Sequence, residues 1–375
     1  MDPDPSRKQI LEKWASGQRP GASELELLAT WELAAARRAR AFGITPENAR
    51  EAIAERGYLF EAVNWFGFAR SETFLETLWI LWLPLAIALS KRQQELGRPL
   101  IQGIVGGQGT GKTTMTKILS LILSCQSDRS YSPPDSGPPY PGLPYAPRPY
   151  ASRRVLSLSI DDLYKTYSDR QNLQKQDPRL VWRGPPGTHD IELGIETLDL
   201  LLSVSPQSDP IPVPRFDKSA WGGAGDRAEP EIVERADIIL FEGWFVGVRP
   251  IEPANFDTAP APIITESDRA FARDSNRRLQ AYLPLWQRLD SLIVLYPTDY
   301  RLSVQWRQQA EREMVAAGKS GMSDEQIEEF VRYFWQALHP ELFIAPLVNN
   351  PDRADLVVEI NGDRTIREIY RPGDS

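Results

Sequence analysis

The chain has 375 residues, of which 41% are hydrophobic and 25% charged, and its formal net charge is -8 at pH 7. This is the composition of a globular protein long enough for about two domains. The acidic balance argues against a nucleic-acid partner, because binding to a phosphate backbone depends on clustered lysine and arginine. The only cysteine, Cys125, excludes an internal disulfide bond and favours a reducing compartment.

The first residues, MDPDPSRKQILEKW, contain early acids and no apolar run. They resemble neither a signal peptide nor a transit peptide, so we expect a cytoplasmic protein. The strongest apolar run, Leu78–Leu89, is interrupted by Pro84. It is shorter than the roughly 20 residues that span a bilayer, which predicts a buried helix and no membrane partner.

The first 98 residues are predicted to form a helical region that packs on a second domain, residues 99–375. Ser23–Phe42 is rich in Ala, Leu, Glu and Arg, and Thr45-Pro46-Glu47-Asn48 resembles a helix cap followed by proline at the first helical position. Several tryptophans in this region, Trp14 and Trp79 among them, would bury large areas. A ligand site lined by tryptophan is the alternative interpretation.

From Leu100 onward, short apolar runs alternate with helical stretches. The predicted strands are Leu100–Val105, Val155–Ile160, Ile211–Val213, Ile238–Phe241, Leu292–Tyr296 and Leu356–Ile360. The predicted helices between them are Thr113–Ser124, Ile191–Leu202, Arg269–Leu283 and Tyr300–Ala317. Continuous apolar strands alternating with helices predict an α/β fold of the P-loop type, with a mainly parallel sheet and helices on both faces.

One segment interrupts this order. Residues 127–152 contain eight prolines together with Ser, Tyr and Gly, so they cannot form a helix or an inner strand. We interpret them as a surface insertion, and a proline-rich docking peptide is the alternative.

A phosphate-binding loop follows the strand that begins at Leu100. The residues expected to bind nucleotide are Gly106, Gly107, Gln108, Gly109, Thr110, Gly111, Lys112, Thr113 and Thr114. They fit the pattern G-x-x-x-x-G-K-[ST] between a strand and a helix. Glycines let successive N–H groups face phosphate oxygens, and the helix N-terminus adds its positive dipole end. Lys112 would contact the β- and γ-phosphates of ATP, and Thr113 would ligate Mg²⁺.

Two acids at strand ends indicate phosphoryl transfer to an alcohol. Asp161, at the end of the second strand, would accept the proton of an attacking hydroxyl. The alternative is that Asp161 and Asp162 only cap a helix. Glu242 ends the strand of DIILFEG and would hold Mg²⁺ together with Thr113, unless it is merely solvated.

Two loops carry several charged or titratable side chains. The first carries Arg183, His189 and Asp190, and the second carries Arg215 and Lys218. Their cations suit a small substrate with a carboxylate, because arginine binds carboxylates in a bidentate manner. Surface salt bridges are the alternative for each residue.

A further pair of arginines lies on the predicted helix Tyr300–Ala317. Either Arg307 or Arg312 is a candidate catalytic residue from a lid that closes over the transferring phosphate. A solvated helix face is the alternative.

Taken together, the motifs GGQGTGKTT, LSIDDLY, RGPPGTHD, PRFDKS, ILFEGW and GMSDEQIEEFVRYFWQALHPELF resemble the D-glycerate 3-kinases of plants and cyanobacteria. That family is related to phosphoribulokinase, uridine kinase and pantothenate kinase. The resemblance covers roughly residues 100–375, and it is weaker for the N-terminal region. It implies transfer of the ATP γ-phosphoryl group to the 3-hydroxyl of D-glycerate, giving 3-phosphoglycerate in photorespiratory carbon salvage. It also implies that Asp161 is the base and that Glu242 is the acid of the fourth strand.

Two alternatives stay open. One is a related kinase that phosphorylates another small alcohol, such as a nucleoside or pantothenate. The other is a P-loop regulatory ATPase whose output is a conformational change. Only a kinase would turn over ATP faster when its acceptor is present.

Overall fold

The computed structural model describes residues 6–64, 71–125, 153–203, 208–316, 318 and 321–374. The proline-rich insertion predicted at residues 127–152 lies outside these ranges. The N-terminal region is helical as predicted: α1 (Arg7–Ala15), α2 (Ala22–Ala34), α3 (Ala36–Ala41), α4 (Ala49–Asn64), α5 (Glu72–Thr77) and α6 (Leu83–Leu96). A π-helical turn, Leu78–Trp82, joins α5 to α6.

Aromatic side chains pack the N-terminal helices together. Trp14 of α1 contacts Phe60 of α4 at 5.2 Å and Trp79 at 5.6 Å between ring centroids. All three rings are at most 2% exposed, so these tryptophans serve packing. The stretch 73–96 is long and apolar enough to cross a membrane, but 78% of its most apolar window is buried inside the protein. It therefore lies in the core as the predicted buried helix.

The central sheet has six strands in the order β2-β5-β1-β6-β7-β8. Its strands are β1 (Leu100–Gly106), β2 (Val155–Ser159), β5 (Ile238–Gly243), β6 (Ser291–Pro297), β7 (Leu356–Ile360) and β8 (Ile366–Tyr370). All neighbours pair in parallel except β8, which is antiparallel to β7. The mainly parallel sheet expected from the sequence is confirmed, and β8 is an edge strand that the sequence analysis did not identify.

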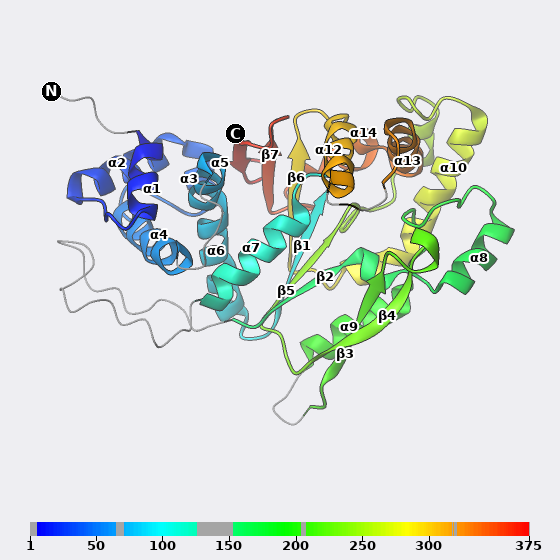
Figure 1. The fold of residues 1–375 in the computed structure, drawn as a ribbon, viewed down its shortest axis with the longest axis horizontal. Helices are drawn as coiled ribbons and strands as arrows, with labels where there is room; N and C mark the ends of the chain where they lie inside the picture. Colours follow the sequence, from blue (N-terminus) through cyan, green and yellow to red (C-terminus); the bar gives the residue numbers. More distant parts are fainter. Residues whose placement is uncertain are drawn as a thin grey trace.

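Helices cover both faces of this sheet, as predicted (Figure 1). On β1, Leu100 and Ile104 point into a core shared with α6, α7 (Lys112–Cys125) and the N-terminal helices. Ile101 and Val105 point to the other face. That face is covered by α9 (Ile191–Leu202), α10 (Glu266–Arg278), α11 (Leu283–Trp286) and α14 (Pro340–Phe343). Burial on both faces explains why these strands are continuous apolar runs.

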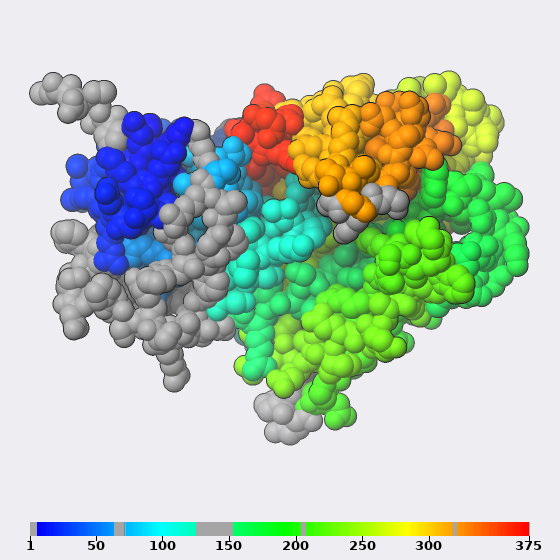
Figure 2. Space-filling model, in the orientation of Figure 1, coloured from blue at the N-terminus to red at the C-terminus, as the bar shows by residue number. Residues whose placement is uncertain are grey.

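One predicted strand does not belong to the parallel sheet. β3 (Ile211–Asp217) pairs only with β4 (Asp226–Val233), in an antiparallel hairpin. The short apolar run of β3 gives no sign of its partner, and β4 is mostly exposed and charged. The hairpin and α8 (Tyr167–Gln176) lie at the opposite end of the molecule from the N-terminal helices (Figures 1 and 2).

Two helices complete the layer near the carboxyl ends of the strands. They are α12 (Leu302–Ala316) and α13 (Asp324–Ala337). α13 starts at a capping box formed by Ser323 and Gln326. Its apolar side packs Val331 and Phe334 into the protein. The carboxyl ends of β1, β2 and β5 thus face a region bounded by α12, α13 and the hairpin, where ligands of open α/β sheets bind.

Candidate active site

The P-loop joins β1 to α7 as the motif requires. Gly109 and Gly111 have φ angles of +77° and +88°, which side chains other than glycine rarely adopt. A Cβ on Gly109 would lie 2.4 Å from the Cβ of Trp306 in α12. The loop is therefore packed directly against α12, and glycine at position 109 is required by both conformation and space.

Lys112 lies inside the loop. Its Nζ donates hydrogen bonds to the carbonyl oxygens of Gly106, at 2.8 Å, and Gly107, at 2.9 Å. Burial lowers the pKa of Lys112, while the nearby carboxylates of Glu242 and Asp161 counteract that shift. An ammonium group bonded only to neutral carbonyls is positioned to bind phosphate oxygens, which carry charge. Gln108 lies on the same loop, and its buried Oε1 has no hydrogen-bond partner in the described part of the chain.

Thr113 and Glu242 form a pair of oxygen ligands beside the loop. The Thr113 hydroxyl lies 3.4 Å from Oε1 of Glu242. Mg²⁺ prefers such hard oxygen ligands and takes only one or two from the protein, the others coming from water and phosphates. Residues 6–64, 71–125, 153–203, 208–316, 318 and 321–374 contain no cluster of three or more His, Cys, Asp or Glu able to hold a metal. The pair therefore fits Mg²⁺ bound together with a nucleotide.

The two acids after β2 have different surroundings. Asp162 Oδ2 accepts hydrogen bonds from the backbone N–H of Ser159, at 2.9 Å, and from Arg215, at 3.1 Å. It thus caps the 3₁₀ turn that begins after Ser159. Asp161 bonds through Oδ2 to Lys218 Nζ at 2.7 Å, and its side chain is 27% exposed. The helix-cap interpretation fits Asp162, and Asp161 is the acid that faces the site.

Asp161 is charged at neutral pH. Burial alone would raise its pKa, but the charge of the Lys218 ammonium and its hydrogen bond outweigh this effect and lower the pKa. A carboxylate that is ionised and partly accessible, at the carboxyl end of a strand beside a P-loop, can accept a proton from an alcohol.

The four predicted cationic and acidic residues on the loops differ in what they bind. Arg215 pairs with Asp162 and, at 2.5 Å, with Glu231. Asp190 caps α9 through the N–H of Leu193 and pairs with Arg227. Lys218 pairs with Asp161, as described above.

Arg183 contrasts with these ion-paired residues. Its Nη1 donates to the carbonyl oxygens of Gly223, at 2.6 Å, and Ala224, at 2.9 Å. Within the described residues its guanidinium has no carboxylate partner. Arg183 is thus a cation whose charge is not compensated by a neighbouring acid.

His189 is 1% exposed and does not face solvent. Its Nδ1 lies 2.8 Å from the hydroxyl of Tyr282, and its ring stacks on Tyr164 at 4.5 Å. Burial lowers the pKa of His189 to about 3, so the imidazole is neutral at physiological pH. His189 is therefore buried against the Tyr164 ring.

The two predicted lid arginines lie on α12. Arg307 pairs with Glu311 at 2.9 Å and lies over the ring of Phe330 in α13. Arg312 is mostly exposed and pairs with Asp324 at 2.8 Å. Among the described residues, neither arginine bonds to the P-loop or to Asp161.

Two residues near the site, Arg170 and Trp221, lie outside any recognisable sequence motif. Arg170 of α8 donates to the carbonyl oxygens of Lys165, Ala224 and Gly225. Trp221, in the hairpin turn, has a φ of +52° and is 64% exposed. An exposed aromatic residue in a strained conformation is typical of functional loops. A large aromatic residue in a glycine-rich turn, AWGGAG, is the signal that could have identified it.

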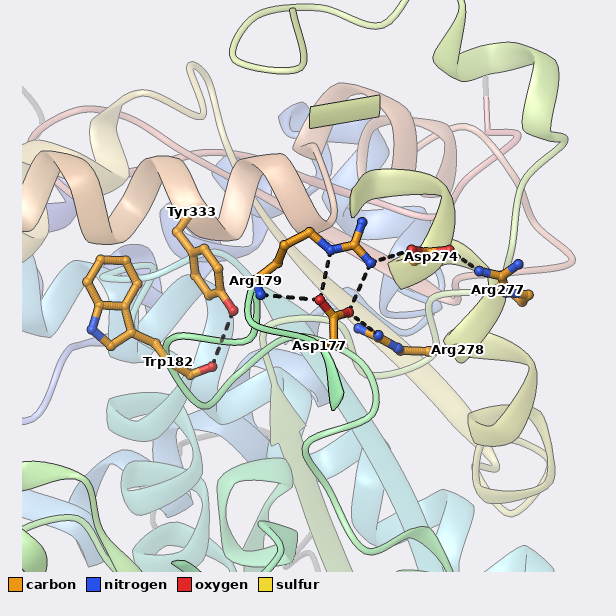
Figure 3. Close-up of polar contacts among 7 residues, drawn as sticks. All are labelled: Asp177, Arg179, Trp182, Asp274, Arg277, Arg278 and Tyr333. Carbon is orange, nitrogen blue, oxygen red and sulfur yellow. Dashed lines mark hydrogen bonds and ion pairs between the residues drawn. The ribbon is translucent and has the colours of Figure 1, made fainter. Parts of the chain in front are cut away.

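A polar network anchors the loop that precedes Arg183 (Figure 3). Asp177 accepts hydrogen bonds from Arg179, at 2.8 Å, and from Arg278 of α10, at 2.5 Å. Arg179 also bonds to Asp274 of α10 at 2.5 Å. On the other side, the hydroxyl of Tyr333 in α13 donates to the carbonyl oxygen of Trp182. The loop is thereby tied to α10 and α13.

An apolar pocket lies beside the P-loop. It encloses about 50 Å³ between Gln108, Trp244, Tyr296, Phe334 and Trp335. Its largely aromatic lining does not suit a small anion.

A strand-to-helix P-loop, the oxygen pair of Thr113 and Glu242, and a charged strand-end carboxylate are the features of a P-loop kinase. No family model matches the sequence. The chain is 32% identical over 278 residues to the chloroplastic D-glycerate 3-kinase of Arabidopsis thaliana. The aligned region covers 71% of this chain and 53% of the plant protein. It is 31% identical to the probable ATP-dependent kinase TDA10 of Saccharomyces cerevisiae, covering 56% of this chain and 74% of that protein.

A solved structure of a named glycerate kinase is also similar to this chain. The D-glycerate 3-kinase of Cryptococcus neoformans var. grubii superposes with a TM-score of 0.62 at 25% identity, covering 76% of this chain and 96% of that one. The chain belongs to the glycerate 3-kinase type of P-loop kinases. It spans about half the length of the plant relative.

Proposed function

We propose that the protein transfers the γ-phosphoryl group of ATP to the 3-hydroxyl of D-glycerate, giving 3-phosphoglycerate and ADP. The names of the plant and Cryptococcus relatives support this acceptor. We further propose that the reaction serves photorespiratory salvage in the cytoplasm, with neither nucleic acid nor membrane as a partner.

The observation that carries the proposal is the placement of Arg183 relative to Asp161. Both lie near the same residue: Tyr164 ends the turn that carries Asp161, and the Arg183 guanidinium lies 5.9 Å from the centroid of the Tyr164 ring. Glycerate is a three-carbon molecule with a carboxylate at one end and the 3-hydroxyl at the other. A cation with no acidic partner among the described residues and a carboxylate base, both close to Tyr164, match those two ends.

Each group of residues in the site has a separate role. Backbone N–H groups of the P-loop and Lys112 bind the triphosphate, and Thr113 with Glu242 would hold Mg²⁺, which neutralises phosphate charge when bound. Arg183 binds the carboxylate of the acceptor and so orients its hydroxyl. Asp161 accepts the hydroxyl proton as the oxygen attacks. Such catalysis consists mainly of positioning and electrostatic stabilisation.

The direct test is steady-state kinetics of Arg183→Ala. Losing an arginine–carboxylate contact costs on the order of 2–4 kcal/mol, so kcat/KM for D-glycerate should fall roughly 30- to 1000-fold. The KM for ATP should stay unchanged, because Arg183 lies on the acceptor side. Arg288→Ala is the matched control, since Arg288 forms a two-armed ion pair with Asp199 outside the site. An Arg183→Ala variant with weakened ATP binding and normal glycerate kinetics would refute the assignment.

The alternative acceptors are tested by ADP release. Wild-type protein should release ADP much faster with D-glycerate than with a nucleoside or pantothenate. A neutral nucleoside has no carboxylate for Arg183, and the carboxylate of pantothenate lies much farther from its hydroxyls than that of glycerate. ADP release that is independent of every acceptor would indicate a regulatory ATPase.

A further inference from the structure

The turn that joins β3 to β4 is bound by two arginines, Arg183 and Arg170 of α8. Arg183 donates through Nη1 to the carbonyl oxygens of Gly223, at 2.6 Å, and Ala224, at 2.9 Å. Arg170 donates through Nη1 to the same Ala224 oxygen, at 2.8 Å, and through Nη2 to the oxygen of Gly225, at 2.5 Å. Three successive carbonyl groups thus bind two guanidinium groups, and the middle carbonyl is shared.

The conformation of this turn depends on glycine and on contacts with α8. Gly225 has a φ of +76°, and a Cβ there would lie 2.4 Å from the ring of Phe216. Its N–H donates to the carbonyl oxygen of Ala220 at 2.8 Å. The indole of Trp221 stacks on Tyr167 of α8 at 4.9 Å with an interplanar angle of 13°. The turn therefore packs against the first residues of α8 and directs its carbonyl groups at the two arginines.

The bonds to the turn determine which edge of the Arg183 guanidinium is free. An Nη group carries two hydrogens, and the two turn carbonyls use both hydrogens of Nη1. Within the described ranges, Nε and Nη2 of Arg183 donate to no other group. These two nitrogens form a fork that can bind a carboxylate in a bidentate manner. The guanidinium also lies 5.9 Å from the ring centroid of Tyr164 and 5.5 Å from that of Phe216. It is thus oriented by its surroundings with this fork unoccupied.

Arg170 differs from Arg183, because each of its three nitrogens donates to a backbone carbonyl group. Its Nε donates to Lys165 at 3.0 Å, in addition to the two bonds with the turn. Burial, and then the neighbouring charge of Arg183, lowers the pKa of Arg170. The two cations therefore repel each other, and their bonds to the turn offset this repulsion. An arginine that is fully engaged with the backbone is suited to holding the turn in place.

We propose that Arg170 is a positioning residue for Arg183: it fixes the turn, and the turn fixes the guanidinium that binds the carboxylate of the acceptor. The inference rests on the proposed kinase function, in which Arg183 recognises a small hydroxy acid. Selection of an acceptor with a carboxylate then depends on α8 and on the hairpin as well as on Arg183. Because a misplacement of about 1 Å costs much of the rate, losing Arg170 weakens recognition although Arg170 does not touch the acceptor.

The test is a double-mutant cycle with Arg170→Ala and Arg183→Ala, measured as kcat/KM for D-glycerate. Arg170→Ala alone should lower kcat/KM roughly 10- to 100-fold and leave the KM for ATP unchanged. Added to Arg183→Ala, it should have an effect of less than about 2-fold, because Arg170 acts only through Arg183. A double variant that shows the full product of the two single losses would overturn the proposal, since Arg170 would then bind the acceptor itself or only support the fold.

Arg170→Lys is the second variant, and it also serves if Arg170→Ala does not fold. Lysine keeps the charge and the stem but lacks the planar fork that reaches three carbonyl groups. Its kcat/KM for D-glycerate should therefore also fall, by about 10-fold. Wild-type kinetics in Arg170→Lys would show that charge at this position is sufficient and would contradict the positioning role.

Nitrogen-15 NMR of the arginine side chains gives a readout that needs no acceptor. The Nε–H signal of Arg183 is assigned as the signal that disappears in Arg183→Lys. It should shift in Arg170→Ala and stay in place in the control Arg288→Ala, whose ion pair with Asp199 lies outside the site. An Arg183 signal that is unchanged in Arg170→Ala overturns the proposal for any acceptor. A shifted signal in a protein whose wild type ignores D-glycerate supports the positioning role and refutes the proposed acceptor.

Discussion

At the scale of single residues, Lys112 is the cation on which phosphate binding depends. Lys112→Ala should lower turnover about 100- to 1000-fold, the loss typical of removing one donor to developing charge. The fold should be retained, because within the described ranges Lys112 bonds only to carbonyl oxygens of its own loop. The measurement is ADP release beside a circular-dichroism melting curve. A folded variant with near wild-type turnover would contradict the P-loop assignment.

Thr113→Ala provides a matched variant in the same loop. It removes an expected metal ligand and leaves the lysine, so it should raise the Mg²⁺ concentration needed for half-maximal rate. A variant whose Mg²⁺ dependence equals that of the wild type would show that Thr113 and Glu242 do not form the metal site.

At the scale of elements, the loop that carries Arg183 is packed against α13. Gly184 has a φ of +133°, and a Cβ there would lie 2.3 Å from the Phe334 ring. Gly184→Ala should therefore displace the loop and lower kcat/KM for D-glycerate, by up to about 100-fold for a 1 Å shift. Adding Phe334→Leu should restore part of the loss.

The control for this experiment is Gly43→Ala. Gly43 also has a positive φ, +66°, but open space around it. Its substitution should cost stability without changing glycerate kinetics. Equal effects of the two glycine variants on kcat/KM would show that backbone strain, and not contact with α13, is responsible.

The network around Asp177 predicts a pH dependence of stability. Hydrogen bonds from Arg179, and then from Arg278, hold the pKa of Asp177 well below its usual range. A carboxyl group whose pKa is lower in the folded state stabilises the protein above its unfolded pKa, and this stability is lost as the pH falls below about 4. Asp177→Asn should lower the free energy of unfolding at pH 7 by about 1.5–3 kcal/mol and reduce its fall below pH 4.

Urea unfolding at several pH values measures this effect. The exposed Asp352 is the control site, and Asp352→Asn should match the wild type at each pH. An Asp177→Asn variant with the same stability and the same pH profile as the wild type would show that the network does not anchor the loop.

At the scale of the whole molecule, the sequence predicted what depends on local patterns. The P-loop, the strands buried on both faces and the N-terminal helices follow from spacing and apolar runs, and each is present. The partner of β3 could not be predicted, because β4 is charged and exposed on both faces. Sequence spacing likewise could not show that His189 stacks on Tyr164, or that Arg183 has no acidic partner in the part of the chain that the structure describes. Those facts depend on how distant segments meet at the strand ends.

The measurement that tests the central claim most directly is identification of the product. The protein is incubated with ATP, Mg²⁺ and D-glycerate, and the phosphorylated product is examined by phosphorus-31 NMR with proton coupling. We predict a phosphomonoester whose phosphorus couples to the methylene protons of C3, which identifies 3-phosphoglycerate. Coupling to the single C2 proton, or phosphorylation of a nucleoside or pantothenate while D-glycerate remains unchanged, would contradict the account.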